Sequence, residues 1–143
     1  MVNDVIADPL AVANELRPVL LRLSRQLRKE TEQLGVTSRQ VTLLWLIRGN
    51  PGLSLRELAA EEGISAPALS GHVDRLEKAG LIERVRDEDD RRRVGLSLTD
   101  EGERLLKRVR ARRTTWLADR LCGLDDDDIE AIEAAIGPLG RLL

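Results

Sequence analysis

The sequence contains no phenylalanine, no tyrosine and two tryptophans, so leucine, isoleucine, valine and alanine must form any hydrophobic core. Its one cysteine, Cys122, excludes an internal disulfide and a cysteine-cluster metal site, and we expect it to be a small buried residue. Its one histidine, His72, excludes a histidine-based metal site or catalytic dyad within one chain. No glycine-rich phosphate loop is present. We therefore expect no metal, no cofactor and no enzymatic activity.

Long apolar segments are also missing. The sequence has no run of about 18 apolar residues that would cross a membrane. Its N-terminal segment has neither the basic start nor the apolar stretch of a signal peptide. These observations predict a cytoplasmic protein with no membrane partner.

The composition does supply a core for one domain, because 42% of the 143 residues are hydrophobic. Charged residues make up 34%, above the usual value of about a quarter, yet the formal net charge is −2. Nucleic-acid binding depends on a local basic patch and not on this sum. The total charge therefore neither predicts nor excludes a nucleic-acid partner.

Hydrophobic periodicity predicts a chain of helices. A leucine stripe indicates a long amphipathic helix over about 10–34, closed by Gly35. Pro18 lies inside this span, which predicts a kink or a later start. Thr-x-x-Gln at 37–40 and Ser-x-x-Glu at 54–57 are capping boxes that start two further helices.

A helix-turn-helix unit and a hairpin follow. Gly63 ends the short helix, and Ser65 is a plausible N-cap for a second helix that tolerates Pro67 in its first turn. Two short helices joined around a glycine form a helix-turn-helix. Alternating apolar residues over 94–98 then indicate a strand, which can pair with 81–86 across the sequence DEDDRRR.

Two more helices complete the chain. The first runs from Thr99 to about Leu121, and we expect its basic run, Arg104 to Arg113, to pair with acids of neighbouring helices. Asp125 and the acids after it predict the start of the last helix, where the helix dipole favours negative charge.

This order of elements resembles the MarR family of bacterial transcription regulators over about 10–143. The resemblance is most specific over 55–102. There the segments DRLEKAGLIER and DxxDRR, followed by SLTDEG, are close to the sequence motifs that are usual in the family. It implies a mainly α fold with a small two- or three-stranded β wing. One domain over 1–143 would contain a winged helix-turn-helix lobe at about 37–99, flanked by dimerisation helices at about 10–34 and 100–143.

The resemblance also implies a function. Such proteins are homodimers that bind a pseudo-palindromic operator in double-stranded DNA, usually as repressors, until a ligand or oxidant releases them. A winged-helix protein–protein interaction module without specific DNA binding is the alternative. Two positions depart from the family pattern: Glu62 stands where an apolar residue is usual, and Gly71-His72 stands where a basic or polar residue precedes an apolar one.

In a winged-helix domain, the second helix of the helix-turn-helix enters the major groove. Its reading edge is small and mostly apolar, so few of its contacts with bases would be bidentate. The residues expected to face DNA are Ser65, Ala66, Pro67, Ala68, Ser70, Gly71 and Arg75. Ser65 is expected to cap the helix as well, and His72 is expected at its back or side.

The wing gives the charge run DEDDRRR a role. In the family pattern the Asp-x-Arg pair falls on Asp90, which would hold the loop, and on Arg92, which would enter the minor groove. The acids before Asp90 need only lie on the outer side of the bend. The remaining expected wing contacts are Arg84, Arg86, Arg91 and Arg93, and the backbone candidates outside the wing are Arg39 and Arg56. The alternative is a solvated charge run at a turn.

Apolar stripes on the first and last helices predict pairing between two subunits. The expected dimerisation residues are Leu16, Leu20, Ile129, Ile132, Ile136, Leu139 and Leu143. A pocket for a small apolar or aromatic effector is expected near Leu16, Leu20, Trp45 and Trp116. With no tyrosine or phenylalanine, that pocket would be mainly aliphatic, and both tryptophans are most simply core residues.

Overall fold

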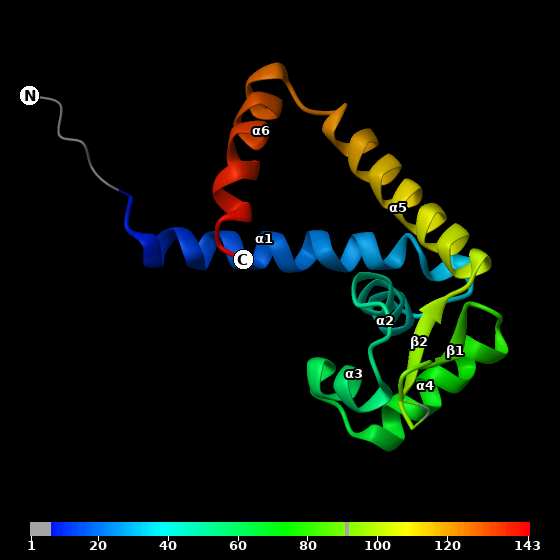
Figure 1. Ribbon diagram of the computed structural model, residues 1–143. Coiled ribbons are helices and arrows are strands. Elements are labelled where there is room, and N and C mark those ends of the chain that lie inside the picture. The colour runs from blue at the N-terminus through cyan, green and yellow to red at the C-terminus, as the bar shows by residue number, and fades with distance from the viewer. Residues whose placement is uncertain (1–6, 91) are drawn as a thin grey trace, which may run out of the picture. The chain divides into compact units, whose positions relative to one another are not determined.

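The computed structural model describes residues 7–90 and 92–143. Its helices and strands follow in the order that the periodicity predicts (Figure 1). They are α1 (Pro9–Lys29), the 3-10 turn η1 (Glu32–Leu34), α2 (Ser38–Gly49), α3 (Leu55–Glu62), α4 (Ala66–Lys78), β1 (Ile82–Arg86), β2 (Val94–Leu98), α5 (Asp100–Leu121) and α6 (Asp126–Gly140). The fold is therefore mainly helical with a two-stranded antiparallel wing, as the sequence predicts.

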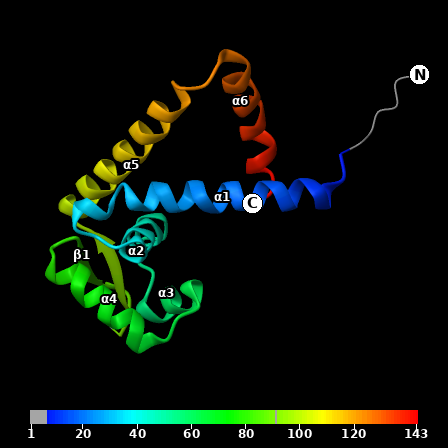
Figure 2. The same ribbon diagram turned by 180° about the vertical axis from the view of Figure 1, so that it is seen from behind.

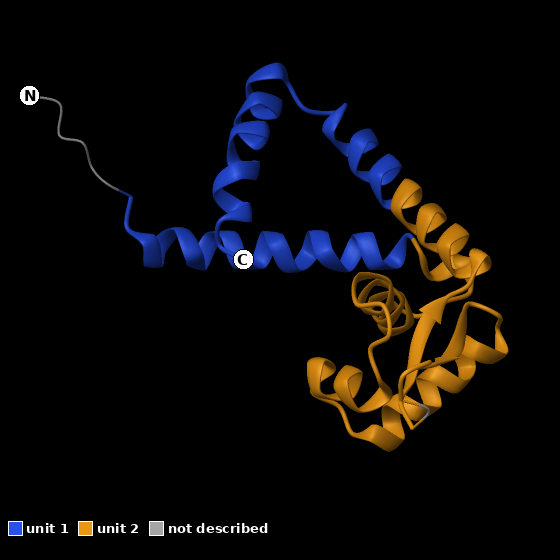
Figure 3. Ribbon diagram, in the orientation of Figure 1, with its two compact units in different colours: residues 1–30, 113–143 blue, residues 31–112 orange. Residues whose placement is uncertain are grey.

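The chain divides into two compact units (Figure 3). Residues 31–112 form one unit, called the lobe below, which contains α2, α3, α4, the two strands and the first half of α5. Residues 1–30 and 113–143 form the other, called the helical unit, which contains α1, the second half of α5 and α6.

The lobe has a single aliphatic core. Leucine, isoleucine and valine fill it, as the lack of aromatic residues requires. The large side chains that are fully buried are Val41, Leu43, Leu44, Ile47, Leu58, Leu69, Val73, Leu76, Ile82, Leu96, Leu106 and Val109. These residues come from α2, α3, α4, both strands and α5, so one core holds α4 and the wing in a fixed arrangement.

Local capping sets the helix starts in the lobe. Both predicted capping boxes are present, Thr37 with Gln40 and Ser54 with Glu57. Ser65 caps α4, since its Oγ accepts a hydrogen bond from the amide of Ala68 at 3.3 Å. Each satisfies amides that have no partner in the first helical turn.

The wing lies against the α2–α3 turn. β1 pairs antiparallel with β2, with Val85 opposite Gly95. A third strand is reduced to one bridge between Ser54 and Gly95, and the Leu96 amide donates to the carbonyl of Leu53 at 3.2 Å. A Cβ at Gly95 would lie 2.7 Å from the Gly52 Cα, so only glycine permits this approach of the two backbones.

In the helical unit, no residue of α1 or α6 is buried among those described. α1 begins at Pro9 with Asp8 as N-cap and continues through Pro18, so the expectation of a later start there is wrong. It ends at Lys29, five residues earlier than predicted. The reason is Leu34, which lies in the 3-10 turn and packs against the lobe core, so it does not extend the helix stripe.

Other predictions about single residues need correction. Cys122 is exposed and not buried. Trp45 is 36% exposed and so is not a core residue, because it lies on the outer side of α2 with the Arg48 guanidinium 5.5 Å from its ring centre. Trp116 is half-buried and has the Arg120 guanidinium 5.2 Å from its ring centre. Within the described part of the chain, no helix is long and apolar enough to cross a membrane.

Candidate nucleic-acid interface

One side of helix α4 is exposed and carries small residues near the start of the helix. Its core face carries Leu69, Val73 and Leu76, which are buried. The residues of its first turn, from Ser65 to Ala68, are exposed, and Ser70 and Gly71 are half-buried. This edge is narrow enough for the helix to approach the floor of a major groove closely.

Arg75 lies one turn further along α4 and is exposed. Its Nη2 is 3.3 Å from Nδ1 of His72. A Cβ at Gly71 would lie 3.9 Å from the same Nη2, so the guanidinium turns back over the glycine. His72 is therefore in contact with a predicted DNA-facing residue, which the sequence did not indicate.

Acidic side chains build the turn of the wing. Asp90 Oδ1 accepts a hydrogen bond from the amide of Arg92 at 3.0 Å, which is the turn-holding contact expected of this aspartate. The carbonyl of Asp90 accepts from the amide of Arg93, and the carbonyl of Arg93 accepts from the amide of Asp87, each at 3.0 Å. Arg91 lies outside the described residues.

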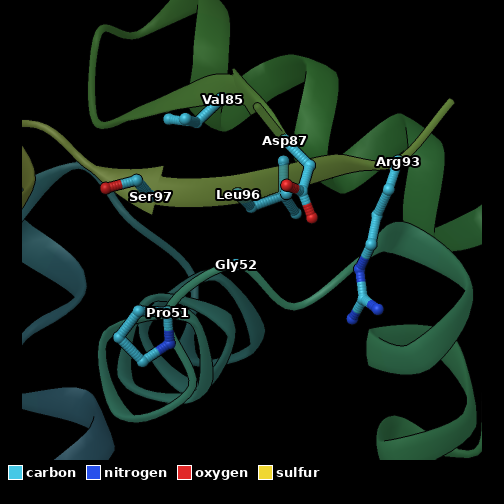
Figure 4. A pocket seen from close by; sticks show the side chains of 8 residues that line it. Pro51, Gly52, Val85, Asp87, Arg93, Leu96 and Ser97 are labelled. Atoms are coloured by element: carbon cyan, nitrogen blue, oxygen red, sulfur yellow. The ribbon is translucent and has the colours of Figure 1, made fainter. Parts of the chain in front are cut away.

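Asp87 differs from its expected place on the outer side of the bend. It is half-buried, and its Oδ1 accepts from the amide of Asp89 at 3.0 Å. With Arg93 it borders a hollow of about 260 Å³ between the wing and the α2–α3 turn, shown in Figure 4. Val85, Leu96 and Pro51 supply its apolar lining.

Arg84 connects the wing to the recognition helix. Its Nη2 lies 2.9 Å from Asp74 Oδ1 and its Nε lies 3.0 Å from Glu77 Oε2. Both carboxylates belong to α4, which contacts β1, and the two elements lie side by side in both views (Figures 1 and 2). The guanidinium therefore fixes the direction of the hairpin relative to the helix that would read bases.

Two further arginines have carboxylate partners. Arg93 Nη2 donates to Glu57 Oε1 at 2.7 Å, which holds the wing to the start of α3. Arg39 Nη1 lies 3.3 Å from Glu62 Oε2. This ion pair explains the unusual acid at position 62, whose side chain is 18% exposed and so would be costly without a partner.

Four other arginines of the predicted set lack such partners. Among residues 7–90 and 92–143, no carboxylate forms an ion pair with Arg56, Arg75, Arg86 or Arg92. Arg56 and Arg92 line one open groove of about 550 Å³ between α3 and the wing. Uncompensated guanidinium groups in one groove attract phosphate oxygens.

Of the four residues predicted to line an effector pocket, Trp45 is the one that belongs to the lobe. Trp45 borders a hollow of about 80 Å³ between α2 and α5, with Arg48 and Glu103 on its wall. Those two residues form an ion pair at 3.0 Å. A pocket that also contains Leu16, Leu20 and Trp116 stays a prediction.

Sequence reasoning missed the carboxylates that hold the wing. Asp74 and Glu77 stand three residues apart on α4, and the sequence predicts for Glu57 only a role in a capping box. Their spacing from each other was the one available signal, since residues three apart share a helix face.

Comparisons with known proteins find relatives among transcription regulators. A family model described as MarR family matches residues 36–94. The regulator FarR of Neisseria gonorrhoeae is 39% identical over 61% of the chain, and the match spans 60% of that protein. The transcriptional repressor MdtR of Bacillus subtilis is 30% identical over 80% of the chain and 74% of its own length.

The fold has also been seen in a complex with DNA. A substituted form of S. aureus MepR, bound to an oligodeoxyribonucleotide, superposes with a TM-score of 0.72. It is 22% identical and the match covers 92% of this chain and 97% of that one. At this identity the likeness concerns the fold alone.

Proposed function

The chain belongs to the MarR family of DNA-binding transcription regulators, and on this premise we propose that it is a repressor that binds a pseudo-palindromic operator as a homodimer. One observation carries the proposal. Several arginines without carboxylate partners in the described part of the chain lie in the same lobe as the exposed first turn of α4, which carries only small residues. Such a surface attracts the DNA backbone electrostatically and leaves the helix free to approach base edges.

In the proposed complex, α4 enters the major groove. Pro67 and Ala68 would contact thymine methyl groups, and Ser65 and Ser70 would donate to bases or phosphates. Arg92 would enter the adjacent minor groove, where a narrow A·T-rich segment has enhanced negative potential. Arg56 and Arg86 would contact phosphates, which position the protein without reading sequence.

Exposed apolar side chains on α1 and α6 support the homodimer. Leu20 is 43% exposed, Ile132 41% and Ile136 64%, although each lies on an apolar helix stripe. Covering these stripes with a second copy would remove apolar surface from water. A twofold pair of lobes would then present two α4 helices about one DNA turn apart, roughly 34–36 Å.

An effector completes the proposal. The exposed ring of Trp45, beside the small hollow between α2 and α5, suits a small aromatic or apolar effector. A thermal-shift screen of the whole protein against phenolic and other apolar acids tests this. A rise in melting temperature with loss of DNA affinity supports release by an effector, and no response across the screen identifies a ligand-blind regulator.

The function itself is tested with duplex fragments selected from the source genome. Fluorescence anisotropy at several salt concentrations should give affinity that falls steeply, with a log–log slope of about −0.9 per phosphate contact. Deleting the gene should raise transcription from the promoter beside a selected fragment. Absent or salt-insensitive binding would instead support the protein–protein interaction module, and a fall in transcription would indicate an activator.

A further inference from the structure

The contact between His72 and Arg75 has a chemical direction. A guanidinium carries only N–H donors, so the His72 Nδ1 must accept from Arg75 Nη2 with its lone pair. The imidazole is then neutral, with its proton on Nε2. The contact therefore restrains the guanidinium without cancelling its charge.

This restraint differs from that of the other held arginines in the lobe. Arg84, Arg93 and Arg39 are each held by carboxylates, which compensate their positive charge. In the described part of the chain Arg75 has no ion pair, and its one side-chain hydrogen bond is to a neutral ring. A charged group that is oriented but not neutralised is ready for an external acceptor.

Gly71 provides the space for this arrangement. Its backbone has no positive φ, so no turn requires a glycine, and glycine in a helix costs about 1 kcal/mol relative to alanine. The guanidinium of Arg75 lies over the bare Cα, with Nη2 3.9 Å from where a Cβ would be. A side chain longer than a methyl group would compete with the guanidinium for this position.

We infer that His72 is a positioning residue that holds Arg75 across Gly71 so that the guanidinium reads a guanine in each operator half-site. The inference rests on the proposed function. One Nη2 proton is used by His72, and the remaining N–H groups can donate to guanine O6 and N7, the pair of acceptors that arginine matches bidentately. A flexible arginine would first have to be ordered on binding, so the restraint favours the discriminating contact.

Two variants of equal shape separate positioning from direct contact. Asparagine places Oδ1 where histidine has Nδ1, so His72→Asn keeps the acceptor for Arg75 and removes Nε2. Leucine has the same branching as asparagine without an acceptor, so His72→Leu removes the restraint. Arg75→Ala removes the reading group itself.

The experiment measures base preference. Operator duplexes selected with the wild-type homodimer are changed one base pair at a time, and relative affinities are measured by competition. We expect one position per half-site where guanine is favoured roughly 5- to 150-fold. Arg75→Ala should abolish that preference, His72→Leu should lose most of it, and His72→Asn should retain it.

The contrary results are equally distinct. An unchanged guanine preference in His72→Leu, or in Arg75→Ala, would overturn the inference. Equal loss in His72→Asn and His72→Leu would also overturn it, because His72 would then act through Nε2. A urea unfolding midpoint equal to that of the wild type, followed by circular dichroism, shows that each variant is folded. If the wild type selects no duplex, the proposed function fails and this inference falls with it.

Discussion

Replacing Gly102 by alanine tests how the start of α5 is locked to the end of α4. Gly102 is buried, and a Cβ there would lie 2.2 Å from the carbonyl oxygen of Leu81. That oxygen already accepts from the amide of Thr99 at 3.1 Å. The Thr99 hydroxyl also donates to the carbonyl of Gly80 at 2.5 Å and accepts from the Gly102 amide at 3.1 Å. The backbones must therefore separate to admit one methyl group.

Opposing effects set the size of the change. Alanine in place of glycine favours the helix by about 1 kcal/mol. Overpacking costs about 1–3 kcal/mol, and loss of the bond to a buried carbonyl costs about 1–3 kcal/mol more. The sum predicts that Gly102→Ala lowers the free energy of unfolding by about 3 kcal/mol, with the clash outweighing the helix preference.

Gly49→Ala is the matched control. Gly49 is also helical and lies in the same lobe, but a Cβ there would meet no atom within 4 Å. The same substitution should therefore raise the free energy of unfolding, by up to about 1 kcal/mol. Urea unfolding followed by circular dichroism measures both. If Gly102→Ala were as stable as the wild type, the close packing of Gly102 on Leu81 would be refuted.

Three further predictions concern the interface and the assembly. Arg92→Ala should weaken binding to a selected operator without changing the urea midpoint, because its side chain has no ion pair among the described residues; matching affinities would remove its minor-groove role. Ser65→Ala should lower the free energy of unfolding by about 1 kcal/mol through loss of the α4 cap, and no change on urea unfolding would refute that role. Ile136→Asp should shift the protein to a monomer in light scattering, while Glu133→Gln on the same helix should not; a variant that stays dimeric would exclude α6 from the interface.

The helix starts were predictable because their causes are local. Thr37, Ser54 and Ser65 each bond to an amide three residues ahead, so a short window of sequence contains the whole signal. The end of the first helix was not predictable, because the spacing of Leu34 matches the leucine stripe although the helix ends before it. Its packing against the lobe core depends on residues distant in sequence.

In the candidate site, too, features with local causes were predictable and contacts between residues distant in sequence were not. The positions of the recognition edge and of Asp90 in its turn follow from local motifs. The carboxylates that hold Arg84 and Arg93 lie 10, 7 and 36 residues away, at Asp74, Glu77 and Glu57. Hydrophobic periodicity contains no information about such ion pairs. The sequence therefore could not distinguish arginines that pair with a carboxylate of the protein from arginines that are available to bind DNA.

The two oxygens of Glu57 have consequences for protein engineering. Oε2 accepts from the Ser54 amide at 3.4 Å and closes the capping box, while Oε1 accepts from Arg93 at 2.7 Å. A chimera that transplants the hairpin from a homologue would therefore also change what the first turn of α3 is bonded to. Residue 57 belongs to the graft, although it stands 30 residues before the hairpin loop begins at Asp87.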